Sequence, residues 1–409
     1  MTELSFPPLD PPEFLTRVRD LLRDSEPQLW EWFASGESRV EYEQAMRVDL
    51  LKSTYRLDEG AHPEVHAAAR EAAERIGVER QLFLYQTDGD GASNAMLASA
   101  AGEAHIVLTG TWLERLTVDE LRAVLGHELG HALLWDRDEG SYRVADRVLL
   151  AMAEHEYAEP SHIETAQRFS RYVEVFCDRA ALVACRDLPA SVRALVKATA
   201  GLKDVSAESY LQQAEELLAA TPEKSEGTTH PRALERAWLL AKWGGGASDT
   251  DDACRAIVEG PQQLDTLDLV EQHRLTDLTR SFLDALFVPK WMRSEAMLGQ
   301  AALYFAGYQP QEPQSSEKHN ESETLWPALR FEDEKLRDYF LFLLLDFAIA
   351  DDEFDDATLA WFLQIAERLE SGERFDQLLK DELKQKDAEL QRVRRDAAAI
   401  LERARGEVS

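Results

Sequence analysis

Apolar residues recur at helical spacing along most of the chain. Between Pro12 and Leu57, leucine, valine and aromatic residues stand three or four positions apart, which predicts an N-terminal helical arm. The same period predicts a helix from Pro63 to Ile76, a longer one from Thr117 to Trp135, and another that opens at Pro160. Thr117 and Glu120 have the Thr-x-x-Glu spacing of a capping box, which marks where the longer helix begins.

Strand patterns are confined to three short segments. Residues 81–86, 94–99 and 104–110 are rich in apolar residues and are separated by turn-forming residues. Three short strands that follow one another closely are most economically arranged as an antiparallel sheet. We therefore expect a mainly α fold of the α+β class, with a small antiparallel sheet just before the helix at Thr117.

Changes in composition divide the chain into four parts. A helical arm (1–62) precedes a central region (63–246) that ends in a run of three glycines. A helical region with a polar, proline-containing linker follows (247–330), and the linker is expected to be an exposed loop or a disordered tether. The last part (331–409) combines apolar helices with a long charged C-terminal helix.

Charge and targeting signals narrow the classes of function. The chain has 409 residues, with 45 basic and 77 acidic side chains, so its formal charge of -32 disfavours nucleic acid and anionic membrane surfaces as partners. Three cysteines suit a reducing compartment. The first residues do not form a secretory signal, and no apolar run approaches the roughly 20 residues that a membrane-spanning helix needs. We expect a cytoplasmic protein without membrane insertion.

The helix that begins near Thr117 contains the motif HExxH, formed by His127, Glu128 and His131. Side chains four residues apart lie on one face of a helix, so both imidazoles point to one place. Such a pair commonly holds zinc, and the intervening glutamate can reach a metal-bound water. Gly126 and Gly130 weaken the helix by about 1 kcal/mol each relative to alanine, which indicates that another element packs closely there.

A second pair of acidic residues occurs in the helix that opens at Pro160. Glu174 and Asp178 lie one turn apart and are flanked by Val173, Val175 and Phe176. Such pairs usually form a solvated helix edge. Here the apolar neighbours draw at least one carboxylate towards an interior, where it needs a partner charge such as a metal.

Four motifs together carry a resemblance. HELGH (127–131), SRYVEVFCDRAAL (170–182), THPRALER (229–236) and NAMLAS (94–99) resemble the HExxH, ExxxD, THPxxxxR and Asn-Ala edge-strand segments of a zinc metallopeptidase family. That family is typified by the type I CaaX prenyl protease and the HtpX heat-shock protease. Typical members are embedded in membranes, whereas no membrane-spanning segment is expected in this chain. The chain therefore resembles a soluble member of the family. Its gluzincin-type core would correspond to residues 63–246.

The resemblance implies a role for each matching residue. His127, His131 and Glu174 would bind one Zn²⁺ per chain, and Glu128 would be the general base and later the proton donor. Asp178 would accept a hydrogen bond from a ligand imidazole. Two residues near the cleft would be candidates to stabilise the oxyanion, His230 and Arg236. His230 also has a structural interpretation, in which it caps a helix.

An extended peptide is expected to add itself to the strand that contains Asn94 and Ala95, through main-chain hydrogen bonds. Asn94 also has a purely structural interpretation, because asparagine is common at turn edges. Peptide or protein substrates are therefore the expected partners, and the specificity would be broad unless other parts narrow it.

The C-terminal part resembles the TerB-like domain of tellurite-resistance-associated proteins. An apolar helix, an acidic turn and an amphipathic helix occupy roughly 331–383, and the turn has Asp351-Asp352 where Asp-Gly is expected. Asp351, Asp352, Glu353, Asp355 and Asp356 are more simply explained as helix N-terminal charge than as a cation site. The C-terminal helix has apolar positions spaced for a protein partner or self-association.

The sequence thus predicts a zinc endopeptidase with helical accessory domains. The rival hypothesis is a catalytically idle adaptor or chaperone-like protein that keeps zinc for stability. Glu128 argues against it, because a purely structural zinc site closes its fourth position and has no use for a water-activating carboxylate. An aminopeptidase is less favoured, since no motif supplies an anchor for a free amine.

Overall fold

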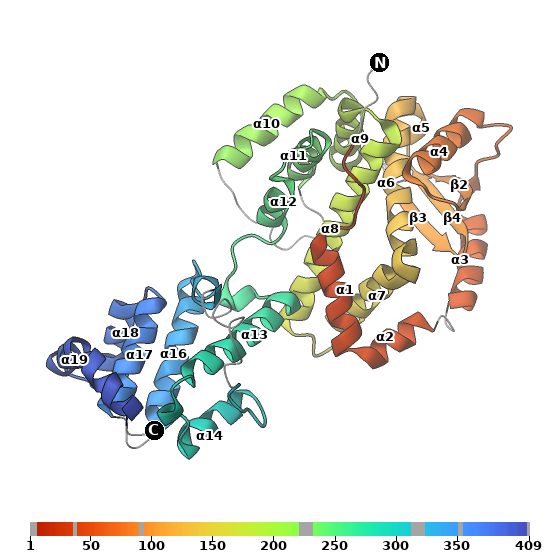
Figure 1. Cartoon of the computed structure of the whole chain (residues 1–409). Coiled ribbons are helices and arrows are strands. Elements are labelled where there is room, and N and C mark those ends of the chain that lie inside the picture. The colour runs from red at the N-terminus through yellow and green to blue at the C-terminus, as the bar shows by residue number, and fades with distance from the viewer. Residues whose placement is uncertain are drawn as a thin grey trace. The chain divides into compact units, whose positions relative to one another are not determined.

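The computed structural model describes residues 6–35, 39–89, 94–220, 232–311, 324–350 and 355–406. The chain divides into two compact units, Met1–Gly260 and Pro261–Ser409, which are considered separately (Figure 1). Helices dominate both units, and one small sheet lies in the first. The expected mainly α fold of the α+β class is therefore confirmed.

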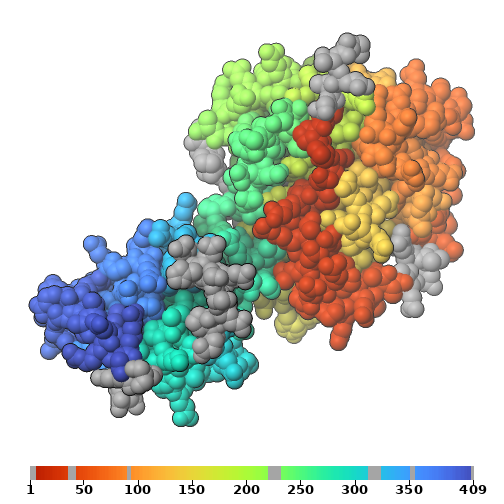
Figure 2. Space-filling model, in the orientation of Figure 1, coloured from red at the N-terminus to blue at the C-terminus, as the bar shows by residue number. Residues whose placement is uncertain are grey.

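Three helices form the N-terminal arm, within the helical region expected from Pro12 to Leu57. The first, α1 (Glu13–Ser25), buries Phe14, Leu15, Val18 and Leu22, whose spacing makes one apolar stripe. Phe14 stacks on Tyr172 of a later helix. The arm lies along the surface of the first unit, where it is coloured red in Figure 2. The other two helices of the arm are α2 (Pro27–Ala34) and α3 (Arg39–Ser53).

The sheet has four strands in the order β1-β2-β4-β3. They are β1 (Tyr55–Arg56), β2 (Gln81–Thr87), β3 (Asn94–Ala100) and β4 (Glu103–Thr109). The expectation of a purely antiparallel sheet is wrong for one pair, because β2 pairs with β4 in parallel. The tight turn at Gly102, which has a positive φ, joins β3 and β4 as an antiparallel hairpin. This hairpin makes β3 an edge strand and leaves β2 on the far side of β4.

The two faces of the sheet carry different partners. Leu84, Ile106 and Leu108 face a core formed with the inner helices. On the other face, Tyr85 and Val107 pack against Leu50 of α3. Figure 1 shows α3 on the side of the sheet away from α6. The first unit also contains α4 (Pro63–Ile76), α5 (Trp112–Arg115), α6 (Val118–Asp136), α7 (Ser141–Ala153), α8 (Pro160–Cys185), α9 (Leu188–Ala200), α10 (Ala207–Ala220), α11 (Ala233–Gly244) and α12 (Thr250–Val258).

Helices α6 and α8 cross in close contact. The predicted capping box starts α6: the Thr117 hydroxyl accepts from the Glu120 N–H, and the Glu120 carboxylate accepts from the Thr117 N–H. Farther along, Gly126 and Gly130 face α8. A Cβ on Gly126 would lie 2.3 Å from the Cβ of Ala184, and one on Gly130 would lie 3.0 Å from the Cα of Cys177. The prediction that a neighbouring element requires both glycines is confirmed.

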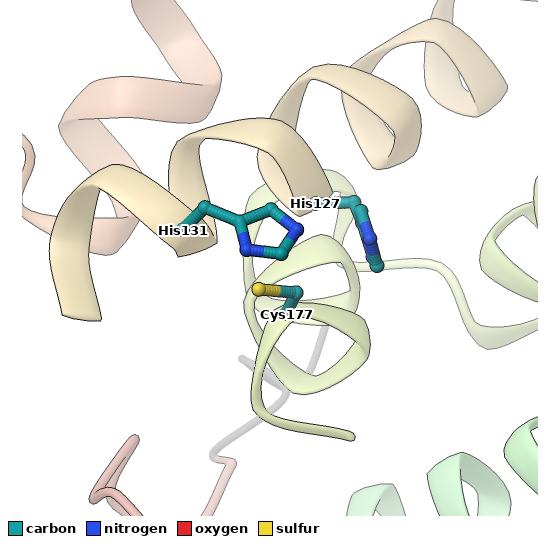
Figure 3. Close-up of side chains that lie close together, drawn as sticks. All are labelled: His127, His131 and Cys177. Atoms are coloured by element: carbon teal, nitrogen blue, oxygen red, sulfur yellow. The ribbon is translucent and has the colours of Figure 1, made fainter. Parts of the chain in front are cut away.

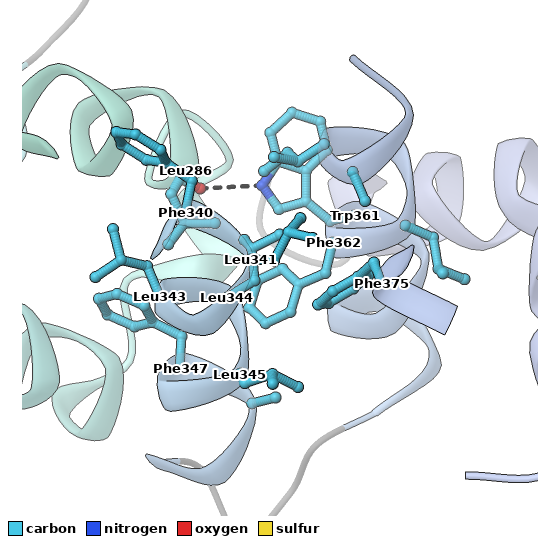
Figure 4. Packing of buried hydrophobic residues seen from close by; sticks show 14 of the residues in the cluster. Leu286, Phe340, Leu341, Leu343, Leu344, Leu345, Phe347, Trp361, Phe362 and Phe375 are labelled. Atoms are coloured by element: carbon cyan, nitrogen blue, oxygen red, sulfur yellow. Dashed lines mark hydrogen bonds between the residues drawn. The ribbon is translucent and has the colours of Figure 1, made fainter. Parts of the chain in front are cut away.

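The second unit is a helical bundle around an aromatic core. Phe282, Phe340, Phe347 and Phe362 are fully buried, and the Trp361 indole N–H donates to the Leu286 carbonyl (Figure 4). The longer helices of the unit are α13 (Leu269–Leu286), α14 (Glu295–Tyr304), α16 (Glu334–Ala350), α17 (Asp356–Arg368), α18 (Gly372–Leu383) and α19 (Asp387–Gly406). Among the described residues, the helices of both units are too short or too polar to cross a bilayer.

The acidic turn of this unit is only partly described. Asp351, Asp352 and Glu353 lie outside the described residues. Asp355 caps α17 by accepting from the Thr358 N–H, and Asp356 pairs with Arg392. Helix capping and ion pairing therefore account for these two carboxylates. The resemblance to TerB-like domains stays a prediction.

Replacing Gly126 with alanine tests the close contact between α6 and α8. Alanine favours the helix by about 1 kcal/mol, but overpacking costs about 1–3 kcal/mol when the neighbour cannot move. We expect Gly126→Ala to lower the free energy of unfolding in urea. Gly299→Ala is the matched control, because nothing lies within 4 Å of a Cβ at that helical position. Similar effects of the two substitutions would contradict the packing argument.

A second prediction concerns His105, which lies on the face of the sheet that α3 covers. Burial lowers the pKa of His105, whose ring lies between the Tyr85 hydroxyl and the Glu103 carboxylate. The folded protein therefore binds fewer protons, so the stability that neutral His105 provides is present above about pH 6.5 and is lost as the pH falls through the lower folded pKa. Wild-type stability should fall more steeply than that of His105→Gln between about pH 7.5 and pH 5. If the free energies of unfolding of the wild type and of His105→Gln changed equally with pH across this range, the assignment would be disproved.

Candidate active site

Three side chains from two helices converge at the centre of the first unit. His127 and His131 project from one face of α6, with ring centroids 5.4 Å apart. Glu174 enters from α8: its Oε2 lies 3.4 Å from His127 Nε2, and its Oε1 lies 3.6 Å from His131 Nε2. The structure thus brings the predicted ligand set together across the glycine contact between the two helices.

These separations fit a zinc ion. Two ligands that share a tetrahedral zinc at about 2.0–2.1 Å stand roughly 3.3 Å apart, close to both observed distances. Two imidazole nitrogens and one carboxylate are also a donor set that zinc accepts in catalytic sites. Such a set leaves a fourth position for water or substrate.

Cys177 is a competing ligand that the sequence analysis did not consider. Its sulfur lies within 4.8 Å of nitrogen atoms of both histidines, below the rings that project from α6 (Figure 3). Burial raises the pKa of the Cys177 thiol well above its usual value, which disfavours the thiolate that binds metal. The thiol also packs against Gly130. Glu174 therefore fits better as the third ligand.

Asp178 and Arg236 form hydrogen bonds and ion pairs with the candidate ligands. Asp178 lies on α8 one turn after Glu174 and accepts from Nδ1 of His127 at 3.1 Å. Arg236 of α11 donates two bonds of 2.7 Å to Asp178 and lies 3.0 Å from Oε2 of Glu174. The guanidinium is only 6% exposed. Its fork lies against two buried carboxylates and reduces their mutual repulsion.

The charges of the cluster follow from these contacts. Burial raises the pKa of both carboxyl groups, but Arg236 and His127 outweigh it and hold Glu174 well below its ordinary value and Asp178 below its own. Burial lowers the pKa of His127, yet hydrogen bonds to Asp178 and Glu174 raise it to about 10. Burial lowers the pKa of His131 to about 4. Without metal, His127 therefore carries a proton that a metal would displace.

Glu128 occupies a different environment from the other carboxylates. It is 8% exposed, and burial raises its pKa to about 7. The backbone of Leu97 in β3 favours the ionised form and so partly opposes this rise in the pKa. Glu128 of α6 and Leu97 of the edge strand both line one cleft. A pKa near neutrality suits a group that must both take and return a proton.

A cleft of about 1120 Å³ contains this centre. The whole edge from Asn94 to Ser99 forms one wall. The Trp112 indole N–H donates to the Asn94 carbonyl, and the Asn94 side chain accepts from the Ala95 N–H. The cleft extends past the centre along α6 in both directions. Towards α7 its lining includes Arg143, Asp146, Arg147 and Leu150, and towards α9 it includes Ser191, Ala194, Leu195, Ala198 and Thr199.

Most of the predicted site residues meet in this cleft. His127, Glu128, His131, Glu174, Asp178, Arg236, Asn94 and Ala95 all line it. His230 lies outside the described residues. The sequence analysis did not find the Leu97 amide, Cys177 or the walls from α3, α7 and α9. No motif marks such residues, because only tertiary packing brings them to the centre.

Comparison with known proteins agrees with this geometry. Residues 60–243, just under half of the chain, match the model of Peptidase family M48. The Arabidopsis thaliana protein named "Plastoglobule-localized metallopeptidase 48, chloroplastic" is 27% identical over 223 residues, which cover 49% of this chain and 62% of the relative. The chain thus spans less than two thirds of that relative. No solved structure matches.

The comparisons show that residues 60–243 are similar to Peptidase family M48 and that the chain is distantly similar to a protein named as a metallopeptidase. The expected resemblance to a metallopeptidase family is confirmed at that level. The name of the Arabidopsis relative places that protein in the chloroplast, and a cytoplasmic location for this chain stays a prediction.

Zinc binding distinguishes Glu174 from Cys177 as the third ligand. We expect Glu174→Ala to weaken zinc affinity by more than about 100-fold, because the metal loses a charged ligand. Cys177→Ala and the exposed His155→Ala should retain about one zinc per chain. Metal content after dialysis against a chelator, with the spectrum of the cobalt-substituted protein, measures this. Loss of zinc from Cys177→Ala but not from Glu174→Ala would reverse the assignment.

Proposed function

We propose that this protein is a zinc-dependent endopeptidase. The observation that carries the proposal is the convergence of His127, His131 and Glu174 at separations that suit ligands of one zinc ion. When bound, zinc would act as a Lewis acid and lower the pKa of a coordinated water. The side chains of this protein would provide the other steps of the reaction.

Glu128 is the proposed general base and acid. Its carboxylate takes a proton from the attacking water and then returns it to the leaving amine. The buried carboxylate lines the cleft together with Leu97 of the edge strand, beside the position of an extended substrate. Burial restricts the orientation of the carboxylate, so the proton is accepted at a defined place.

Asp178 and Arg236 are proposed to position the ligands. Asp178 accepts from Nδ1 of His127, which leaves Nε2 of that ring directed towards the metal position. Arg236 directs its donors to Asp178 and Glu174. This geometry favours a positioning role over the oxyanion role expected for Arg236. The proposal for His230 as oxyanion donor rests on the sequence resemblance alone.

An extended peptide is the proposed substrate. Within the part of the chain that the structure describes, β3 is hydrogen-bonded to β4 along one side only, and its other side lies in the cleft. A peptide strand can pair with that edge through main-chain hydrogen bonds, with Asn94 and Ala95 near one end. Because the cleft continues past the centre towards both α7 and α9, it accommodates chain on both sides of the cleaved bond. This favours an endopeptidase over an enzyme that removes terminal residues.

Glu128→Gln separates the peptidase from an idle zinc-containing adaptor. The substitution keeps the shape of the side chain and removes the base, so cleavage of casein or a peptide library should fall by at least about 100-fold. Zinc content should remain unchanged. The control is Glu74→Gln on the exposed surface of α4, which should keep wild-type activity. A zinc-loaded wild-type protein whose cleavage does not depend on Glu128 would favour the adaptor.

A further inference from the structure

The N-terminal arm contributes a wall of the cleft, although it lies before the region that matches Peptidase family M48. Ala45, Met46, Asp49 and Leu50 of α3 line the cleft. Their spacing of one, four and five residues places them on one face of the helix. The arm therefore does more than pack against the peptidase core.

Contacts on the adjoining face fix α3 to the sheet. The Glu43 carboxylate accepts from the Ala101 N–H at 3.2 Å, and Arg47 Nε donates to the Glu103 carboxylate at 2.7 Å. Leu50 packs with Tyr85 and Val107. These contacts hold α3 at the turn and face of the β3–β4 hairpin. The α3 wall therefore has a defined position beside the edge strand.

Side-chain alternation along β3 determines what a bound peptide would meet. Ala95 and Leu97 face the core next to α6, whereas Ala98 packs on the face covered by α3. Met96 alternates with Leu97 and is 54% exposed. A strand added at this edge would alternate in the same way. One set of its side chains would face Glu128 and the metal ligands, and the other set would face α3.

The chemistry on the α3 side is mostly apolar. Met46 and Met96 supply flexible thioether side chains, which adapt to apolar groups of different shapes. Leu150 of α7, 48% exposed, lines the same cleft. Asp49 adds a negative charge at this wall and disfavours acidic side chains. Met96 and Leu150 are exposed and Met46 is half-buried, so all three offer apolar surface that a peptide would cover.

We propose that α3 forms a second wall of the substrate groove and selects extended peptides with large apolar side chains on that side. This inference rests on the proposed function and names the substrate class. Selection at the α3 wall would narrow the broad specificity that main-chain pairing alone gives.

A binding experiment with the full-length Glu128→Gln protein tests the proposal. The probes are two fluorescein-labelled peptides with lysine-bearing ends, one with a central run of leucine and one with serine at the same positions. Fluorescence anisotropy gives the preference for leucine over serine. Adding Met46→Asp should reduce that preference by at least about tenfold, or roughly 1.4 kcal/mol. Met96→Ser, on the facing strand, should reduce it in the same direction.

Val48→Asp is the matched control, because Val48 lies on the same helix, is 48% exposed and does not line the cleft. It introduces the same charge and should leave the preference within about twofold of the parent. Equal effects of Met46→Asp and Val48→Asp would overturn the inference. Unfolding in urea identifies a variant that has lost its fold, and Met96→Ser then decides the result.

The two proposals can fail separately. If the Glu128→Gln protein binds neither peptide or binds both equally, the α3 wall has no selective role and the inference is overturned. If it prefers leucine in a Met46-dependent manner while the wild-type protein cleaves nothing, the proposed peptidase activity is wrong. The α3 wall would then remain a peptide-binding surface.

Discussion

The close contact between α6 and α8 is the constraint on which the first unit depends. Gly126 and Gly130 remove side chains from the interface, so the backbone of α6 approaches Cys177 and Ala184 of α8 directly. The two histidines and Glu174 can then meet, although they come from different helices. Each glycine disfavours its own helix by about 1 kcal/mol. The site geometry thus depends on two residues that lower the helix propensity of α6 and allow α8 to approach it closely.

The buried charges next to this contact balance one another. Without metal, protonated His127 and Arg236 face the carboxylates of Glu174 and Asp178, so two positive groups oppose two negative ones. An isolated buried charge would cost several kcal/mol, and mutual pairing offsets that cost. Exchange of the His127 proton for a divalent cation makes the cluster more positive by one charge. That excess would be available to polarise an oxygen in the cleft.

Local patterns were sufficient to predict the parts of the structure that depend on neighbours in sequence. The capping box at Thr117, the two aligned histidines and the need for small residues at Gly126 and Gly130 all follow from helix geometry. The parallel pairing of β2 with β4 does not, because strand order depends on which segments form the hairpin. The α3 wall likewise arises from tertiary packing of an arm whose own sequence carries no motif.

The position of Arg236 has a consequence for protein synthesis. During synthesis, the histidines and Glu174 are added to the chain first. Arg236 follows Asp178 by a further 58 residues. Until then the two carboxylates lack their guanidinium partner. A nascent chain that ends before Arg236 therefore carries an incomplete cluster of charges. The charges of the cluster are thus balanced only after α11 has been made.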